Sequence, residues 1–479
     1  MRKKWNEVPV AVKASTVYTV CSVLQKCLSF LTMPLFARLL TTEQYGQYTV
    51  YTSWSSIFTI FITLYMAFGC FNTAMVRFEE DRDRYIAGIQ GLCTVLAGVF
   101  LAIYLPLQTY WNRLLELPTS LVLLMVAEIV MTFSLSCWYG KLRFSFRYKP
   151  VAAMTLLIAV TSPLLAYFFI TASPEKGYAR ILGYALVVVV FGGAVYIRNL
   201  IRGKTFFHKD YWRYALSFSV PLIPYYLSQV IFNQSDRIMI SHYCGQDIAG
   251  VYGVACTLAL MLNFVLNAIN DSYVPWLYQR LKDGNTSDSP RIANIIAIIM
   301  AILLWGVTVL APELIYLLAG PQYTQAIWAV GPVAMSVLLL FYAQLFINIQ
   351  FYYEEKALLV AASLGAAVLN IVLNALLIPK LGFLVAAYTT LISYIVFAFA
   401  NYIAMGRTMK KQGQLAQLFH VRGLLLILIV FLALSFGTML LYSYPVIRLV
   451  LAAVALAVLG FNSKRIIKLL QLFKQKNIE

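Results

Sequence analysis

Two charged side chains lie near the middle of long apolar runs of the sequence. Lys26 falls within residues 11–36, and Glu128 falls within residues 119–139. A charge near the centre of a bilayer costs about 2.5–3.5 kcal/mol on insertion scales, so such residues are functional candidates. The lysine could contact an anionic substrate, and the carboxyl could exchange a proton. A structural ion pair between them is the alternative, since both are expected at a similar depth.

Four further charges lie closer to the ends of apolar runs. Asp236 and Arg237 come about one turn before an outer end, Asp271 comes near an inner end, and Arg38 closes the first run. Side chains at these places can extend to the membrane interface. Interfacial anchoring is therefore the alternative to a functional role for all four.

Polar residues also recur at helical spacing inside six of the apolar runs. The six stripes are Ser15, Tyr18, Ser22, Gln25, Lys26 and Ser29; Glu128, Thr132 and Ser136; Tyr225, Gln229, Asn233 and Asp236; Asn263, Asn267, Asn270 and Asp271; Gln344 and Asn348; Asn370 and Asn374. Steps of three and four residues place each stripe on one helix face. Amides can join packed helices, but six stripes together favour a shared water-filled cavity. The candidate substrate-binding amides are Gln25, Gln229, Asn233, Asn263 and Asn267.

The composition indicates which kind of protein must position these side chains. Of the 479 residues, 61% are hydrophobic and 12% are charged, and the mean hydropathy is +0.77. Soluble domains contain about 45–50% apolar and about 25% charged residues. A soluble enzyme, a disordered chain and a fibrous repeat are therefore excluded, and we expect a polytopic membrane protein.

Fourteen runs are long and apolar enough to cross a bilayer, which needs about 20 residues. The predicted spans are 11–36, 47–70, 85–107, 119–139, 151–171, 178–197, 214–240, 250–277, 292–311, 326–348, 357–378, 383–405, 423–442 and 446–461. Lipid-exposed backbone must satisfy its own hydrogen bonds, so the predicted fold is all-α. The longest predicted outer loop covers residues 311–325.

The distribution of basic residues predicts the orientation of these helices. If the N-terminus lies inside, 28 of the 37 Lys and Arg residues lie on the inner side. Six lie outside, Arg38 and Arg180 among them, and three lie within helices. This asymmetry predicts that both termini are cytoplasmic. The net charge of +18 is then a feature of topology and lipid headgroups, and we expect no nucleic-acid partner.

Cysteine and histidine patterns predict neither a metal site nor a cofactor. The seven cysteines show no CxxC or Cys/His spacing, and there are only three histidines. We therefore expect the thiols to be packing residues. The basic segment 1–15 contains no A-x-A cleavage site and is interpreted as a retained cytoplasmic end.

Two landmarks repeat at nearly one offset. Residues 45–48 and 249–252 share a Gly-x-Tyr pattern 204 residues apart, and a Pro-containing turn recurs 205 residues apart. This predicts two like-oriented six-helix lobes in pseudo-twofold relation, although ordinary loop chemistry is the alternative. The predicted parts are an N-terminal lobe at 1–205, a second lobe at 206–410, and two further helices with a basic tail at 411–479. Prolines at 34, 221 and 224 would allow the first helix of each lobe to bend.

Three segments resemble the signatures of bacterial polysaccharide-biosynthesis flippases, which belong to the multidrug/oligosaccharidyl-lipid/polysaccharide exporter superfamily. They are Ala-Arg-Leu-Leu-Thr-Thr-Glu-Gln-Tyr-Gly-Gln-Tyr at 37–48, Ser-Asp-Arg-Ile-Met-Ile at 235–240, and the Asn/Pro/Gly pattern at 370–387. The resemblance covers essentially the whole chain. It implies a central cavity between two lobes in a bacterial plasma membrane. It also implies export of undecaprenyl-diphosphate-linked oligosaccharide units for capsule, O-antigen or exopolysaccharide.

The resemblance further implies which residues would act. Similar flippases use cationic residues near the first and seventh helices, which by position are Lys26, Arg38 and Arg237. Glu128, Asp236 and Asp271 are weaker candidates for proton or ion coupling, because the family has no fixed coupling residue. Implied partners are membrane lipids and the polymerase and glycosyltransferases of the pathway.

A working hypothesis is that Lys26 pairs with Glu128 in the empty protein and moves to phosphate on loading, after which Glu128 binds a proton. An organic-cation exporter of the same superfamily is one alternative, but a cationic first helix and fourteen spans argue against it. A membrane polymerase is another, although the sequence has neither a long outer loop nor a nucleophile–His–acid cluster. A scaffold would leave the six stripes unexplained.

Overall fold

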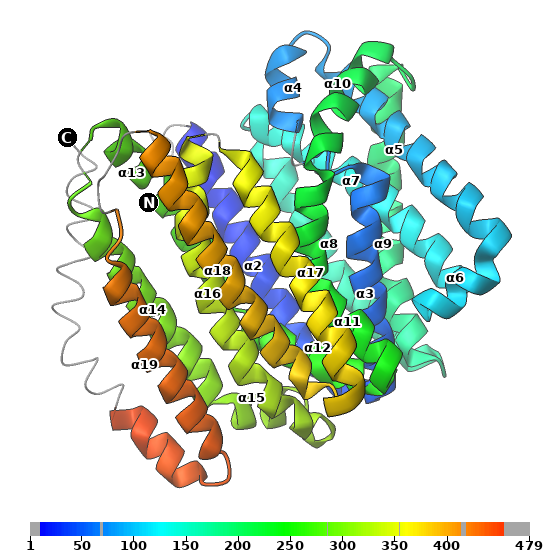
Figure 1. Cartoon of the computed structure of the whole chain (residues 1–479). Helices are drawn as coiled ribbons and strands as arrows, with labels where there is room; N and C mark the ends of the chain where they lie inside the picture. Colours follow the sequence, from blue (N-terminus) through cyan, green and yellow to red (C-terminus); the bar gives the residue numbers. More distant parts are fainter. Residues whose placement is uncertain (1–9, 68–69, 285, 354, 413–417, 455–479) are drawn as a thin grey trace, which may run out of the picture. The chain divides into compact units, whose positions relative to one another are not determined.

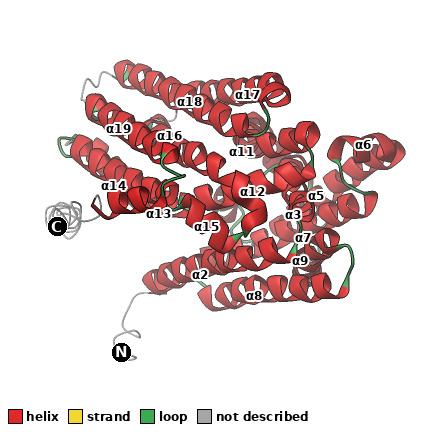
Figure 2. Ribbon diagram, turned by 90° about the horizontal axis from the view of Figure 1, so that it is seen from below, coloured by secondary structure: helices red, strands yellow, loops and turns green. Residues whose placement is uncertain are grey.

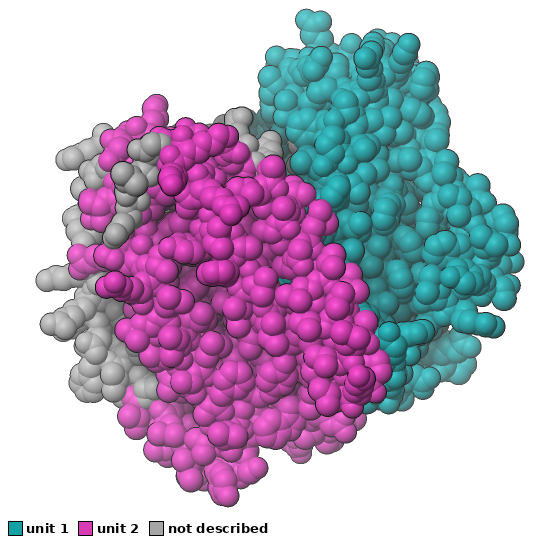
Figure 3. Space-filling view, viewed as in Figure 1, with its two compact units in different colours: residues 1–251 teal, residues 252–479 magenta. Residues whose placement is uncertain are grey.

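The computed structural model describes residues 10–67, 70–284, 286–353, 355–412 and 418–454. Within these ranges the regular structure consists of α-helices and short 3-10 helices, and no strand occurs (Figures 1 and 2). The chain divides into two compact units, residues 1–251 and 252–479 (Figure 3). The all-helical prediction is confirmed for the described residues.

Unit 1 is built around α9 and α3. Helix α9 packs against α8, α7, α5 and α3, while α3 also packs against α7 and α11. The elements of this unit are α2 (Val10–Leu39), α3 (Thr42–Thr63), α4 (Phe71–Arg77), α5 (Arg82–Tyr104), η1 (Leu105–Leu107), α6 (Gln108–Leu115), α7 (Thr119–Phe144), α8 (Tyr148–Ala172), α9 (Lys176–Gly203), α10 (Lys209–Ser219), η2 (Val220–Leu222), α11 (Ile223–Cys244) and the first turns of α12 (Gln246–Leu260).

Unit 2 is built around α16, most of whose side chains are buried. Helix α16 packs against α18, α14 and α19, and α17 packs against α18. Its further elements are α13 (Asn263–Lys282), α14 (Ser289–Val309), α15 (Ala311–Leu318), η3 (Pro321–Ala326), α16 (Ile327–Tyr352), α17 (Lys356–Leu381), α18 (Leu384–Lys411) and α19 (Val421–Leu440). The predicted loop at 311–325 is wrong, because α15 and η3 occupy it.

Twelve helices of the described ranges are long and apolar enough to cross a membrane. They correspond to twelve of the fourteen predicted spans. The span predicted at 47–70 corresponds to α3, whose many hydroxyl and amide groups keep it outside this set. The last predicted span begins with a short apolar helix, Pro445–Val454, and then leaves the described residues. The count of fourteen and the cytoplasmic termini remain predictions, as does the division at 205 and 410.

Two of the predicted long helices are interrupted. The seventh consists of α10 and α11 with η2 between them, at Pro221 and Pro224. Proline removes a backbone donor, so the predicted bend has its expected cause. The eighth consists of α12 and α13, separated by a turn at residues 261–262. This second break is not predicted, since neither proline nor glycine marks it.

The glycines of the repeated Gly-x-Tyr landmark contact each other. A Cβ on Gly46 would lie 1.7 Å from the carbonyl oxygen of Gln246, and one on Gly250 would lie 2.1 Å from that of Thr42. Both obstacles are backbone atoms, which cannot rotate away. Helices α3 and α12 therefore begin in a contact that only glycine permits.

Replacing Gly46 with Ala is expected to destabilise unit 1, because overpacking costs about 1–3 kcal/mol. Gly98→Ala on α5 is the matched control, since a Cβ there would meet nothing within 4 Å. In a helix, Ala is favoured over Gly by about 1 kcal/mol. Thermal unfolding in detergent should show a lower Tm for Gly46→Ala and an unchanged or higher Tm for Gly98→Ala. Equal effects would contradict the contact.

Candidate functional site

Glu128 on α7 is hydrogen-bonded to α3. The Tyr51 hydroxyl donates to the Glu128 Oε2 at 2.7 Å, and the Tyr51 side chain is buried. Glu128 itself is half-buried. The Tyr51 hydroxyl thus supplies a donor for the ionised form of the Glu128 carboxyl. A role of Glu128 in proton exchange remains a prediction.

A second polar link joins α3 to α11. Gln234 Oε1 accepts hydrogen bonds from the Ser53 hydroxyl at 3.1 Å and from Arg237 Nη1 at 2.9 Å. These contacts hold the half-buried Arg237 toward α3. Asp236 is only 4% exposed, and its Oδ1 accepts from the Arg237 backbone N–H at 2.9 Å. Burial of Asp236 is not what interfacial anchoring predicts.

The candidate residues of α2 lie on the exposed part of that helix. Gln25, Lys26 and Arg38 are all exposed, and the Ser29 hydroxyl donates to the Gln25 backbone oxygen at 3.0 Å. In this state the Glu128 carboxyl interacts with Tyr51. The exchange of Lys26 between Glu128 and phosphate remains a prediction.

The remaining candidate amides are divided between the two units. On α11, Asn233 Nδ2 donates to the Gln229 backbone oxygen at 2.7 Å, and both residues are half-buried. On α13, Asn267 and Asp271 are exposed. Asn263 is half-buried, and its Oδ1 accepts no hydrogen bond from the described residues. Part of the α13 stripe is thus exposed within unit 2, whereas Gln229 and Asn233 of α11 are half-buried.

Residues of three of the six stripes have a packing role. Asn370 Nδ2 donates to Thr390 Oγ1 at 3.2 Å, Asn374 Nδ2 donates to Asn370 Oδ1 at 3.2 Å, and the Thr389 hydroxyl donates to Asn374. These groups are buried between α17 and α18. Similarly, Asn348 on α16 donates to Asn270 on α13 at 2.9 Å. For these pairs the cavity interpretation is wrong, since helical spacing is the same for contacts that join helices.

Three residues of the site are not among the residues predicted from the sequence. Tyr51, Ser53 and Gln234 form the links between α3, α7 and α11. For Ser53 the available signal is a seventh stripe on α3, where Thr49, Ser53 and Ser56 recur at helical spacing. Arg180, counted with the outer loops, lies inside α9 and is buried.

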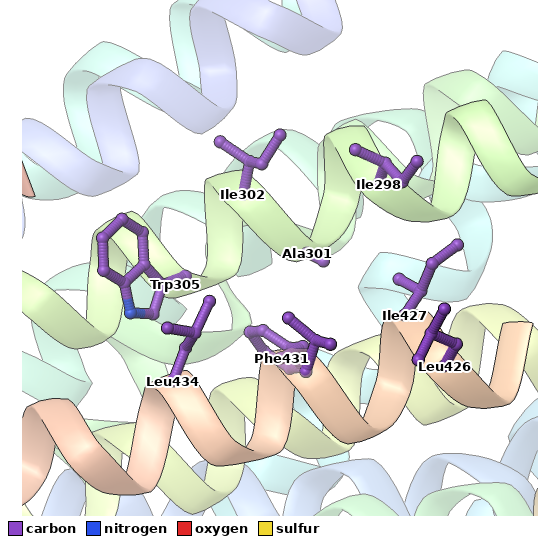
Figure 4. A pocket seen from close by; sticks show the side chains of 9 residues that line it. Ile298, Ala301, Ile302, Trp305, Leu426, Ile427, Phe431 and Leu434 are labelled. Carbon is purple, nitrogen blue, oxygen red and sulfur yellow. The ribbon is translucent and has the colours of Figure 1, made fainter. Parts of the chain in front are cut away.

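Unit 2 carries an apolar pocket between α14 and α19 (Figure 4). Its volume is about 270 Å³, and its lining residues are Ile298, Ala301, Ile302, Trp305, Leu426, Ile427, Val430, Phe431 and Leu434. The Trp305 indole N–H donates to Thr438 Oγ1 at 3.0 Å. Because this polar group is satisfied, the pocket offers an almost entirely hydrocarbon wall.

The sequence and the fold are similar to those of known proteins. The family described as "Polysaccharide biosynthesis protein" matches residues 11–281. The Haemophilus influenzae "Lsg locus putative protein 1" is 23% identical over 375 residues, 75% of this chain and 89% of that protein. An "Uncharacterized membrane protein" of the same organism is 26% identical over 283 residues, 57% of this chain and 67% of that protein.

Among solved structures, "Lipid II flippase MurJ, inward closed conformation" has a TM-score of 0.68 at 13% identity, covering 94% of this chain and 100% of that one. An inward-facing multidrug resistance MATE family transporter of the MOP superfamily has a TM-score of 0.57 at 14% identity, covering 82% and 96%. At these identities the likeness shows the fold, which is that of MurJ and the MATE transporters.

Proposed function

The chain belongs to the polysaccharide biosynthesis protein family, and from that premise we propose that it is a flippase for lipid-linked oligosaccharides. It moves undecaprenyl diphosphate carrying a sugar repeat unit from the cytoplasmic to the outer leaflet of a bacterial plasma membrane. The observation that carries the proposal is the family match over residues 11–281. The fold shared with a lipid II flippase supports it.

The cationic residues supply the contacts that a diphosphate needs. A sugar diphosphate cannot cross about 30 Å of hydrocarbon without replacement of its water. Lys26 and Arg38, exposed on α2, and Arg237, held by Gln234, provide positive charge for the phosphates. Arginine matches phosphate oxygens with a planar fork of donors. Amides such as Gln229 and Asn233, both on α11, bond the sugars in place of water.

The lipid tail needs a different surface. A polyprenyl chain loses nothing by staying in hydrocarbon, so only the headgroup has to enter a polar path. The pocket between α14 and α19 has an apolar wall, which suits one isoprenoid segment. The two lobes then alternate in exposing the headgroup to each side while the tail stays in lipid.

Transport of a labelled undecaprenyl-diphosphate oligosaccharide in proteoliposomes tests the proposal. An impermeant quencher is added outside the vesicles. Labelled sugar that moves to the inner leaflet becomes protected from the quencher, and labelled sugar that moves to the outer leaflet becomes accessible to it. Lys26→Ala is expected to slow transport by about tenfold or more, the usual effect of losing one charge-assisted hydrogen bond. Lys380→Ala, at an exposed position on α17, is the control and should transport normally.

An organic-cation exporter is the second candidate, favoured by the likeness to MATE transporters. Under that function the wild-type chain would export cationic dyes, and Lys26→Ala would change dye export. Dye export without movement of the labelled lipid would overturn the flippase proposal. Movement of the lipid without dye export would exclude the exporter.

A further inference from the structure

A buried arginine in unit 1 lies outside the set of residues assigned above. Arg180 is in the second turn of α9 and is 5% exposed. The centre of its guanidinium lies 3.6 Å from the ring centroid of Tyr48, 4.6 Å from that of Tyr45 and 4.8 Å from that of Phe36. Helices α2, α3 and α9 thus build an aromatic cage around one cation.

Two nitrogens of this guanidinium form no hydrogen bond with the described residues. Cation–π contacts engage the faces of the planar group, whereas its N–H donors point outward in the plane. Nε and Nη1 of Arg180 are buried and donate to no acceptor among the described residues. Buried donors to which nothing bonds are costly, and a buried charge without an anion is more so.

A second buried arginine, Arg448, has a structural role and can be compared with Arg180. Arg448, in unit 2, is 2% exposed. Its Nη2 is ion-paired with Glu313, and its guanidinium lies 5.5 Å from the Tyr442 ring centroid. Nε and Nη1 of Arg448, like those of Arg180, donate to no acceptor among the described residues, so the difference between the two arginines is the ion pair. Across the described ranges Arg180 forms none. Aromatic packing alone therefore does not complete the site.

We propose that Arg180 is an anion-binding residue whose missing partner is the phosphate of a lipid. The aromatic cage fixes the guanidinium plane, and the phosphate oxygens accept from its free edge in a charge-assisted hydrogen bond. Two lipids carry this chemistry, the undecaprenyl-linked substrate and a bilayer phospholipid. The substrate arm rests on the proposed function, whereas the phospholipid arm does not.

Binding measurements on the full chain in detergent test the assignment, with undecaprenyl phosphate and phosphatidylglycerol as separate probes. Arg180→Met places an apolar side chain among the rings, Arg180→Lys keeps the charge without the planar donors, and Arg113→Met removes an exposed arginine of α6 as control. We expect Arg180→Met to lose about tenfold in affinity for undecaprenyl phosphate, with Arg180→Lys intermediate and the control unchanged.

The Tm of the lipid-free protein separates a ligand site from a packing role. Removing an unbonded buried charge should leave the Tm of Arg180→Met unchanged or raise it, while the Tm increase on adding undecaprenyl phosphate is lost. A loss of affinity for phosphatidylglycerol alone would support the site and identify a phospholipid as its ligand.

Unchanged affinity for both lipids would overturn the proposal, as would a lower lipid-free Tm with normal binding. The two proposals can fail separately. If the wild-type chain binds no undecaprenyl phosphate, the proposed function fails, and phosphatidylglycerol still tests Arg180.

Discussion

Replacing Glu128 with Gln is expected to remove the response of transport to an imposed proton gradient. The amide keeps the size of the side chain and can still accept from the Tyr51 hydroxyl, but it cannot take up a proton. If Glu128 couples proton movement to the flipping step, transport should fall at least about tenfold under a gradient, within the range that acid–base groups contribute. Without a gradient, the residual rate should match that of the wild type. Proteoliposomes with and without a pH difference provide the measurement.

Tyr51→Phe is the matched control for this experiment. It removes the hydrogen bond of 2.7 Å but leaves the titrating carboxyl, so the response to the gradient should remain. A Glu128→Gln protein that still responds fully would remove Glu128 from the coupling mechanism. Asp236 on α11 and Asp271 on α13, the other acidic candidates, would then be replaced by Asn in the same assay.

Replacing Glu313 with Gln is expected to destabilise unit 2 by about 3 kcal/mol, because it leaves the buried charge of Arg448 uncompensated. The arginine side chain of this pair is 1% exposed, whereas that of Glu313 is 41% exposed. The two partners are therefore unequal. Arg448→Met leaves only the partly hydrated carboxylate of Glu313, so it should lower the free energy of unfolding less than Glu313→Gln does.

Thermal unfolding of the two single variants and of the double variant measures this asymmetry. The double variant, Glu313→Gln with Arg448→Met, should recover much of the stability lost by Glu313→Gln alone. The coupling follows because the second change removes the charge that the first leaves unpaired. Equal losses in both singles, added together in the double, would show that charge compensation is not the cause.

The helices themselves could largely be predicted from the sequence. Long apolar runs give twelve spans because hydropathy and the need for internal backbone hydrogen bonds act locally. The break at Pro221 could also be predicted, because the missing backbone donor of proline is likewise a local property. The break between α12 and α13 could not, since no residue there forbids a helix and packing in the folded unit decides it.

The site could be predicted only in part, because residue spacing does not say what a helix face contacts. Asn370 and Asn374 have the same spacing as Gln229 and Asn233, yet the first pair joins α17 to α18. Arg180 has the sequence position of an interfacial anchor and lies instead inside an aromatic cage. Both differences arise from tertiary packing. The spacing of residues in a sequence gives the helix face on which they lie but not the neighbour that this face contacts.

The polarity of α3 has a consequence for how the chain is made. Helix α3 is not among the helices that are long and apolar enough to cross a membrane by length and composition. Most of its hydroxyl groups donate to backbone oxygens of α3 itself, but those of Tyr51 and Ser53 also reach α7 and α11, which leave the ribosome about 80 and 180 residues later. Stable insertion of α3 therefore has to wait for these later segments. Unit 1 is then completed only after its later helices have entered the membrane. Truncated chains that end before α11 should therefore be targets for membrane proteases.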